Sequence, residues 1–166
     1  MGPDELRAAQ ASVTRRYRFA AAHRLHSDRL SAEENRRQFG KCNNPNGHGH
    51  NYVLFVTVTG AIDPGTGCVT DVGKLDRLVS ETVVARFDHQ DLNHDPAFAE
   101  RTTTGENLVL LIWDLLAGRI QGGRLEKIGL IETRDNFFEY AASIDRGIRS
   151  NNAAAGKELH ATAQSQ

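Results

Sequence analysis

Apolar and polar residues alternate along two early segments of the chain, 13–23 and 48–59. Such alternation is typical of a half-buried strand. In the first segment the shared parity includes Phe19, Ala21 and His23. In the second it comprises His48, His50, Tyr52, Leu54, Val56 and Val58. A turn-forming stretch at 62–67 and a short strand at 68–70 are predicted to follow the second strand.

The middle of the chain carries apolar residues at the three- and four-residue steps of a helix. Asp71 is the predicted N-cap of one helix, which ends near Asp88. A second helix begins at the capping-box sequence 103–106, and the glycines at 122–123 end its pattern. A second capping box at 31–34 predicts a short helix between the first two strands.

Two further strands are predicted at about 125–133 and 137–142, around a tight turn at 134–136. The order of main elements is therefore strand, strand, helix, helix, strand, strand. We interpret this as an α+β fold with a four-stranded antiparallel sheet and two helices on one face. Four strands leave two unpaired edges, which favours oligomerisation.

The domain boundaries follow from the same patterns. Residues 1–12 lack strand or helix patterning and are predicted to be a flexible arm, and 143–166 lack aromatic residues and are predicted to be a disordered tail. The folded unit is predicted to span 13–142.

Composition narrows the class of protein. The chain has 166 residues with a net charge of −1, so it has one domain's length and no global field that favours nucleic acid or membrane partners. Its opening lacks the apolar run of a secretory signal, and two cysteines form no disulfide framework, so we expect a cytoplasmic protein. Residues 1–42 hold nine basic and five acidic side chains, which suits an anionic small ligand or an ordinary solvated face.

Three histidines form the strongest chemical signal. His48 and His50 are two apart on a predicted strand, so both rings point to one side, and His23 ends the neighbouring strand on the matching parity. Three imidazoles without a fourth protein ligand are typical of a catalytic zinc ion with one open position. The alternative is a pair of half-buried polar strand residues. His26 has the other parity and is predicted to be an exposed bystander.

Five residues separate Cys42 from the His-Gly-His sequence, and Cys42 lies in a polar loop beside Lys41. A neighbouring cation lowers the pKa of a thiol, which favours a role in proton transfer over that of an inert cysteine.

Asp88 and His89 form a potential acid–base pair, although a histidine at a helix C-terminus also acts as a cap.

Glu132 shares a predicted strand face with apolar residues, where a carboxylate needs a partner. It could accept two parallel N–H bonds from an amidine-like ring edge, or form a salt bridge with Arg134.

Together these residues resemble the 6-pyruvoyl-tetrahydropterin synthase family, over about residues 15–140. The segments that carry the resemblance are 19–25, 33–35, 39–52, 60–67, 88–93, 104–107, 112–114 and 132–133. The resemblance implies the tunnelling fold, in which trimers close into a barrel and two trimers stack into a homohexamer with active sites between subunits.

The resemblance also implies roles for individual residues. His23, His48 and His50 would hold Zn²⁺, and Cys42, Asp88 and His89 would transfer protons. Glu132 would anchor the pterin, helped by Thr104 and Glu106. The implied reaction converts 7,8-dihydroneopterin triphosphate to 6-pyruvoyl-tetrahydropterin with loss of triphosphate, so the partner would be a small pterin triphosphate.

Three alternatives stay open. The first is 6-carboxytetrahydropterin synthase, whose cysteine usually precedes the His-x-His by three residues, whereas five intervene here. The second is a non-catalytic pterin- or zinc-binding module on the same fold, and the third is a purely structural zinc site. Gly105 departs from the family, which commonly has a hydroxyl-bearing residue there.

Overall fold

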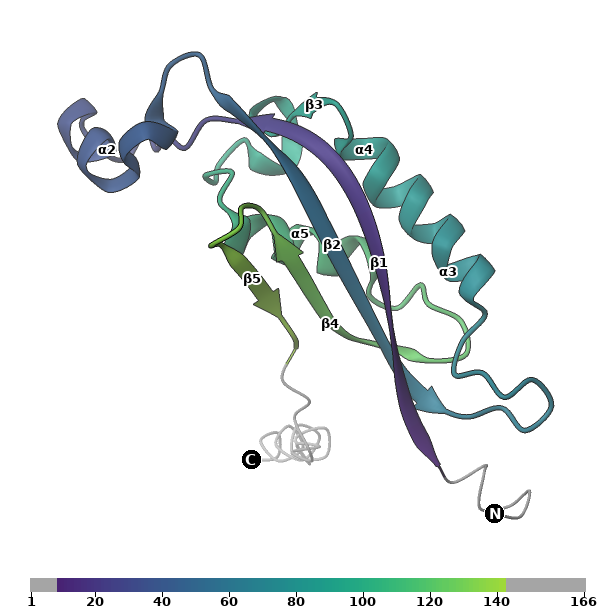
Figure 1. Ribbon diagram of the computed structural model, residues 1–166. Coiled ribbons are helices and arrows are strands. Elements are labelled where there is room, and N and C mark those ends of the chain that lie inside the picture. The colour runs from purple at the N-terminus through teal and green to yellow at the C-terminus, as the bar shows by residue number, and fades with distance from the viewer. Residues whose placement is uncertain (1–8, 143–166) are drawn as a thin grey trace, which may run out of the picture.

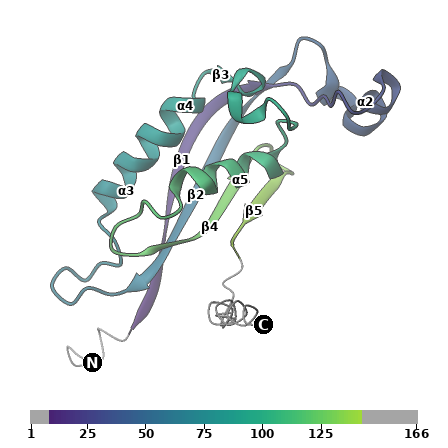
Figure 2. The ribbon, with the colours of Figure 1, turned by 180° about the vertical axis from the view of Figure 1, so that it is seen from behind.

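The computed structural model describes residues 9–142, and in them a sheet carries helices on one of its faces (Figures 1 and 2). The predicted arm up to residue 8 and the predicted tail from 143 lie outside the described residues. The strands are β1 (Gln10–His23), β2 (His48–Ala61), β3 (Gln90–Asp91), β4 (Arg124–Ile131) and β5 (Phe137–Tyr140). The helices are α2 (Ala32–Phe39), α3 (Val72–Val79), α4 (Ala85–Phe87) and α5 (Gly105–Leu116).

Four of the strands are those predicted, but the sheet has five and is mixed. Its order is β3-β1-β2-β4-β5. The two residues of β3 pair in parallel with Ala21 and Ala22 of β1, whereas the other strands run antiparallel. The expectation of a purely antiparallel four-stranded sheet was therefore incomplete. Two residues are too short a segment to show an apolar alternation.

The ladder between β1 and β2 is the longest in the sheet, and its register fixes the positions of the three histidines. Fourteen residues of β1 pair with fourteen of β2, from Gln10 opposite Ala61 to His23 opposite His48. β1 thus begins three residues earlier than predicted. The predicted strand at 68–70 is wrong, because the structure has only irregular backbone there.

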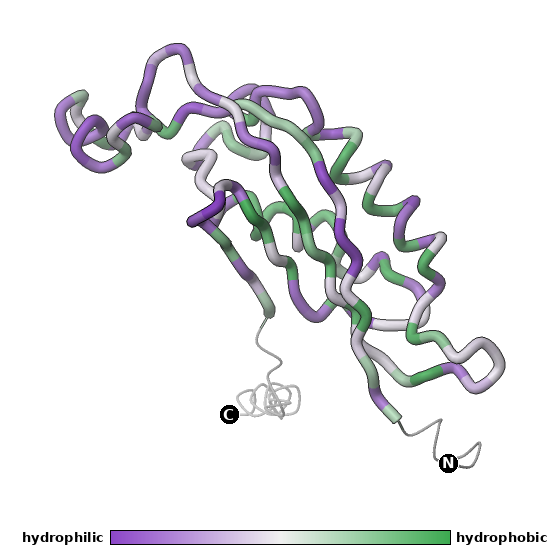
Figure 3. The backbone as a smooth tube through the Cα atoms, in the orientation of Figure 1, coloured by the Kyte–Doolittle hydropathy of each residue, from purple (hydrophilic) through white to green (hydrophobic). Residues whose placement is uncertain are grey.

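The two predicted helices are present and cover the same face of the sheet (Figure 2). α3 begins after its N-cap Asp71 and continues through a π-helical turn, Ser80–Val84, into α4. α5 begins after its N-cap Thr104 and ends at Leu116, so the capping box predicted at 103–106 is wrong by one residue: Thr104 caps the helix by accepting the N–H of Asn107. Their apolar sides pack on the inner face of the sheet, where Leu54, Val79 and Ile112 are fully buried. The alternation of hydrophobic and hydrophilic residues along the strands is visible in Figure 3.

The connection between β1 and β2 extends beyond the end of the sheet and carries α2 (Figure 1). The predicted capping box is confirmed: the Ser31 hydroxyl accepts from the N–H of Glu34, whose carboxylate accepts from the N–H of Ser31. A 3₁₀ turn, η1 (Gly40–Asn43), follows α2 and leads back to His48. This connection therefore brings Cys42 to the end of the sheet where His23 lies.

Within the described residues, every helix is too short or too polar to cross a membrane.

Candidate metal centre

Three imidazole rings meet where the β1–β2 ladder ends. His23 and His48 are paired across the two strands, and His50 is opposite Ala21, so all three rings lie on the helix-covered face. Their ring centroids are 4.6 to 5.0 Å apart, and one nitrogen from each ring lies within 4.8 Å of the others. The predicted convergence of the three histidines on one point is thus present in the structure.

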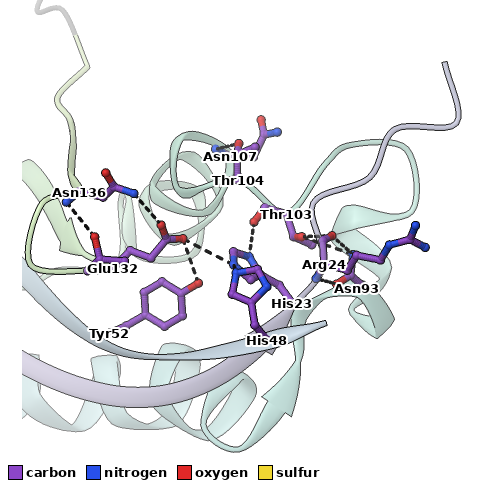
Figure 4. A network of polar contacts seen from close by, with 11 residues as sticks. His23, Arg24, His48, Tyr52, Asn93, Thr103, Thr104, Asn107, Glu132 and Asn136 are labelled. Atoms are coloured by element: carbon purple, nitrogen blue, oxygen red, sulfur yellow. Dashed lines mark hydrogen bonds and ion pairs between the residues drawn. The ribbon is translucent and has the colours of Figure 1, made fainter. Parts of the chain in front are cut away.

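The hydrogen bonds of these rings fit a divalent cation. Nδ1 of His23 lies 2.8 Å from the carbonyl oxygen of Thr103, so this nitrogen carries the proton and Nε2 presents a lone pair (Figure 4). That Nε2 lies 3.1 Å from Nε2 of His48. His50 Nε2 is buried without a hydrogen-bond partner among the described residues. Burial lowers the pKa of both His23 and His50, which keeps them neutral as metal binding requires.

Glu132 lies beside the histidines, at the end of β4. Its Oε1 is 3.7 Å from Nε2 of His23 and accepts a hydrogen bond of 3.4 Å from the Tyr52 hydroxyl, while Oε2 accepts from the side chain of Asn136 at 3.3 Å (Figure 4). The alternative salt bridge with Arg134 is absent among the described residues, because Arg134 pairs with Asp135 instead. The Glu132 side chain is 10% exposed, so these contacts largely enclose its carboxylate.

Tyr52 is almost completely buried between this carboxylate and the core, and it stacks on Phe19. Burial and the nearby Glu132 charge raise the pKa of the Tyr52 hydroxyl, with a smaller contribution from Cys42. Tyr52 thus stays a hydrogen-bond donor to Glu132 at any physiological pH.

Cys42 reaches this end of the molecule through η1. Its carbonyl oxygen accepts the N–H of Leu25 at 2.9 Å, two residues beyond His23. The thiol is partly exposed, and neither Cys42 nor Cys68 forms a disulfide within the described residues. The main chain therefore holds the backbone of Cys42 against the segment that follows His23.

Asp88 and His89 lie at the edge of β1 rather than among the three histidines. One oxygen of Asp88 accepts the N–H of Ala20 at 2.8 Å, and the other lies 3.0 Å from Nδ1 of His89. Ala20 precedes His23 by three residues, which is about 10 Å along a strand. The His89 side chain is 80% exposed. Asp88 and His89 are thus in contact with each other, and the His89 imidazole is exposed at the edge of the sheet.

Thr104 and Glu106 lie at the start of α5. The Thr104 hydroxyl accepts the N–H of Asn107, which makes Thr104 the N-cap of the helix, and Glu106 is exposed in its first turn. His26, predicted to be a bystander, contacts Asn43 and Asp28 instead of the cluster.

A polar cavity of about 970 Å³ opens next to this site. Arg24, Asn93, Arg101, Thr102 and Asn107 are among its lining residues, and two of these adjoin His23 or Thr103 in the chain. Acidic side chains also line it, so the basic excess of the first third of the chain does not produce a purely basic pocket.

Sequence reasoning missed the residues that support the ligands. Tyr52 shares the parity of His48 and His50, so its position could have been found from the alternation alone. Thr103 and Asn136 contact His23 and Glu132 through tertiary folding, for which the sequence carries no local signal.

Comparison with known proteins identifies the relatives of this chain. The family model described as 6-pyruvoyl tetrahydropterin synthase matches residues 12–143. The human 6-pyruvoyl tetrahydrobiopterin synthase is 47% identical over 135 residues, which cover 81% of this chain and 93% of the human one. The Drosophila melanogaster enzyme of that name is 42% identical, covering 78% of this chain and 79% of its own.

A solved structure supports the same relationship. The Caenorhabditis elegans 6-pyruvoyl tetrahydropterin synthase superposes with a TM-score of 0.77 at 39% identity, covering 81% of this chain and 97% of that chain.

Proposed function

Because the chain belongs to the 6-pyruvoyl tetrahydropterin synthase family, we propose roles for its own residues in the reaction of that family. The activity is that of a lyase, which converts 7,8-dihydroneopterin triphosphate to 6-pyruvoyl-tetrahydropterin and eliminates triphosphate. One observation supports the assignment of the site above all others: the cluster of His23, His48 and His50 next to the carboxylate of Glu132.

The three histidines are proposed to hold a zinc ion. The donor set of three neutral imidazoles suits zinc better than magnesium or calcium, and the Thr103 carbonyl keeps His23 in the tautomer that binds metal. When bound, the ion supplies a Lewis acid for the hydroxyl groups of the substrate side chain, which acidifies the neighbouring C–H bonds.

Glu132 is proposed to bind the pterin ring. A carboxylate accepts two parallel N–H bonds from an amidine-like edge, and the Tyr52 hydroxyl and the Asn136 amide hold the Glu132 carboxylate in orientation. Thr104 and Glu106, at the N-terminal end of α5, are proposed to make further pterin contacts.

Cys42, Asp88 and His89 are proposed to transfer protons. Cys42 would remove the proton from the activated carbon, and the Asp88–His89 pair would accept and return protons during the internal redox and elimination steps. The outward direction of His89 supports a site completed by a neighbouring subunit, since its ring is exposed at an edge of the sheet.

The proposed assembly is a homohexamer of two stacked trimers. β3 and β5 are the outer strands of the sheet in the described residues, and pairing with other subunits would satisfy the exposed edge groups. Light scattering on the purified chain measures the assembly directly.

We also place the protein in the cytoplasm, where the thiols of Cys42 and Cys68 would stay reduced.

Incubation with 7,8-dihydroneopterin triphosphate, followed by mass identification of the pterin formed, tests the function. The expected product is 6-pyruvoyl-tetrahydropterin, released with triphosphate only when the protein carries metal. Formation of 6-carboxytetrahydropterin would reassign the chain to the sister activity. Tight pterin binding without turnover would reduce it to a binding module.

A further inference from the structure

The peptide that follows the metal ligand His23 lies beyond the last paired residues of the β1–β2 ladder. His23 and His48 are the final pair in the register, so the sheet offers no strand partner to Arg24 on that side. On the other edge of β1, where β3 pairs with Ala21 and Ala22, the side chain of Asn93 binds the peptide groups of Arg24. Its Oδ1 accepts the N–H of Arg24 at 2.6 Å, and its Nδ2 donates to the carbonyl oxygen of Arg24 at 2.9 Å.

The same carbonyl connects this peptide to the group that orients His23. The hydroxyl of Thr103 donates to the Arg24 carbonyl at 3.2 Å and lies 3.4 Å from Nδ2 of Asn93. The carbonyl of Thr103 in turn accepts from Nδ1 of His23. Asn93, Arg24, Thr103 and His23 therefore form a closed set of contacts, drawn together in Figure 4.

The opposite side of the segment 24–25 holds the turn that carries Cys42. The N–H of Leu25 donates to the Cys42 carbonyl at 2.9 Å, and the Leu25 carbonyl accepts from the side chain of Asn43 at 2.6 Å. Nε of Arg24 donates to the Asn43 carbonyl at 3.1 Å. The segment 24–25 therefore contacts both the group that orients His23 and the backbone of the turn that carries Cys42.

We propose that Asn93 is a positioning residue for the metal centre: its amide binds the peptide of Arg24 at two points and thereby fixes the direction of the His23 ring and the place of the Cys42 turn. The proposal rests on the proposed function in one respect, namely that His23 binds the metal. An amide is needed because one group must accept from an N–H and donate to a C=O. A carboxylate can only accept.

Asn93→Asp tests this requirement, because it keeps the shape and the acceptor but places an oxygen against the Arg24 carbonyl. Zinc affinity by chelator competition should fall at least about tenfold, the scale observed when groups that orient metal ligands are replaced. The visible spectrum of the Co²⁺-loaded protein should also change at saturating metal, which a general loss of stability would not produce. Gln121→Glu is the matched control, since it makes the same amide-to-acid change at a distant site and should leave both measurements unchanged.

Thr103→Val is a second variant, in case Asn93→Asp fails to fold. It keeps the carbonyl that binds His23 and removes only the hydroxyl that donates to Arg24, so a smaller fall in zinc affinity is expected. Hydrogen exchange of the Arg24 amide should become faster in Asn93→Ala, even without metal.

Wild-type zinc affinity and cobalt spectrum in both Asn93→Asp and Thr103→Val would overturn the proposal while leaving the metal site intact. Failure of the wild-type protein to bind zinc would instead overturn the metal site itself, and the proposal with it.

Discussion

The carboxylate of Asp88 lies 3.0 Å from Nδ1 of His89, although the two residues are neighbours in the chain. Adjacent residues in regular structure point apart, and the backbone of His89 explains the exception. His89 has a φ of 58°, in the left-handed region, and its N–H donates to the carbonyl of Ala20. The turn at the end of α4 thus folds the imidazole back onto its own neighbour. This geometry is not detectable in the sequence Asp-His.

Replacing Asp88 by Asn should remove the carboxylate from the pair while keeping an oxygen for the Ala20 N–H. The amide cannot take up a proton from His89, so we expect kcat to fall by about two orders of magnitude or more, the scale of general acid–base groups. Zinc content should stay at the wild-type level. Steady-state kinetics together with metal analysis checks both, and an unchanged kcat would exclude the pair from proton transfer.

Cys42→Ala should likewise keep the zinc and lose at least about two orders of magnitude in rate, because no other proposed group replaces the thiolate as base. Cys68→Ala is the matched control, since Cys68 is exposed in the 62–70 turn region and should be dispensable. Near-normal turnover in Cys42→Ala would remove the thiol from the mechanism.

Tyr52→Phe should act on substrate binding rather than on chemistry. It deletes the hydroxyl that holds Glu132, a bond to a charged group at the long distance of 3.4 Å, so we expect KM for the pterin to rise about tenfold with little change in kcat. Tyr17→Phe is the control, because its hydroxyl bonds Asp76 away from the site. Equal KM values in the two variants would argue against an orienting role for Tyr52.

A pH dependence of stability is expected from Asp76 on α3. Hydrogen bonds from the Arg15 guanidinium at 2.7 and 3.0 Å and from the Tyr17 hydroxyl at 2.8 Å lower the pKa of Asp76 below its ordinary value of 3.8. As the pH falls, the Asp76 carboxylate is therefore protonated at a higher pH in the unfolded chain than in the folded protein. The contribution of Asp76 is complete above its ordinary pKa and is lost as the pH falls through the lowered one.

Asp76→Asn should consequently reduce the free energy of unfolding at neutral pH and flatten its decline below pH 3.8. Urea unfolding at a series of pH values from about 2 to 7 measures both effects. If the free energy of unfolding of Asp76→Asn declined with falling pH as steeply as that of the wild-type protein, the contact of Asp76 with Arg15 and Tyr17 would have no energetic effect.

Much of this fold was predictable because its signals are periodic. The alternation over β1 and β2 gave the parity that brings His23, His48 and His50 to one face, and the capping sequences located the starts of α2 and α5. The convergence of the three histidines follows from this periodicity, since a strand side chain's direction is fixed by its parity.

The parts that could not be predicted depend on contacts between distant segments. Asn93 binds Arg24 from 69 positions away and Thr103 binds His23 from 80, and no periodic pattern in the sequence indicates either contact. β3 forms only because Asp88 and His89 attach the chain to the edge of β1. Such contacts are determined by tertiary packing, which a local pattern does not encode.

Gly105 illustrates how a departure from the family pattern is explained by packing. It is the first residue of α5, and a Cβ at this position would overlap the ring of Phe138 on β5, with Cζ only 2.6 Å away. The aromatic ring thus occupies the space that a side chain at 105 would need. A hydroxyl-bearing side chain at position 105 would therefore collide with Phe138 in this structure.

Gly105→Ala should therefore destabilise the protein by about 1–3 kcal/mol, the usual cost of overpacking, although Gly-to-Ala in a helix ordinarily gains about 0.5–1 kcal/mol. Gly73→Ala is the matched control: it is also in the first turn of a helix, where its Cβ would meet Asp71 at an ordinary 3.4 Å, and it should stabilise. Gly105→Ala should cost much less in a Phe138→Val background than in the wild-type protein, because the smaller side chain vacates the overlapped volume. A double-mutant cycle by urea unfolding measures this coupling, and strictly additive effects would contradict the packing explanation.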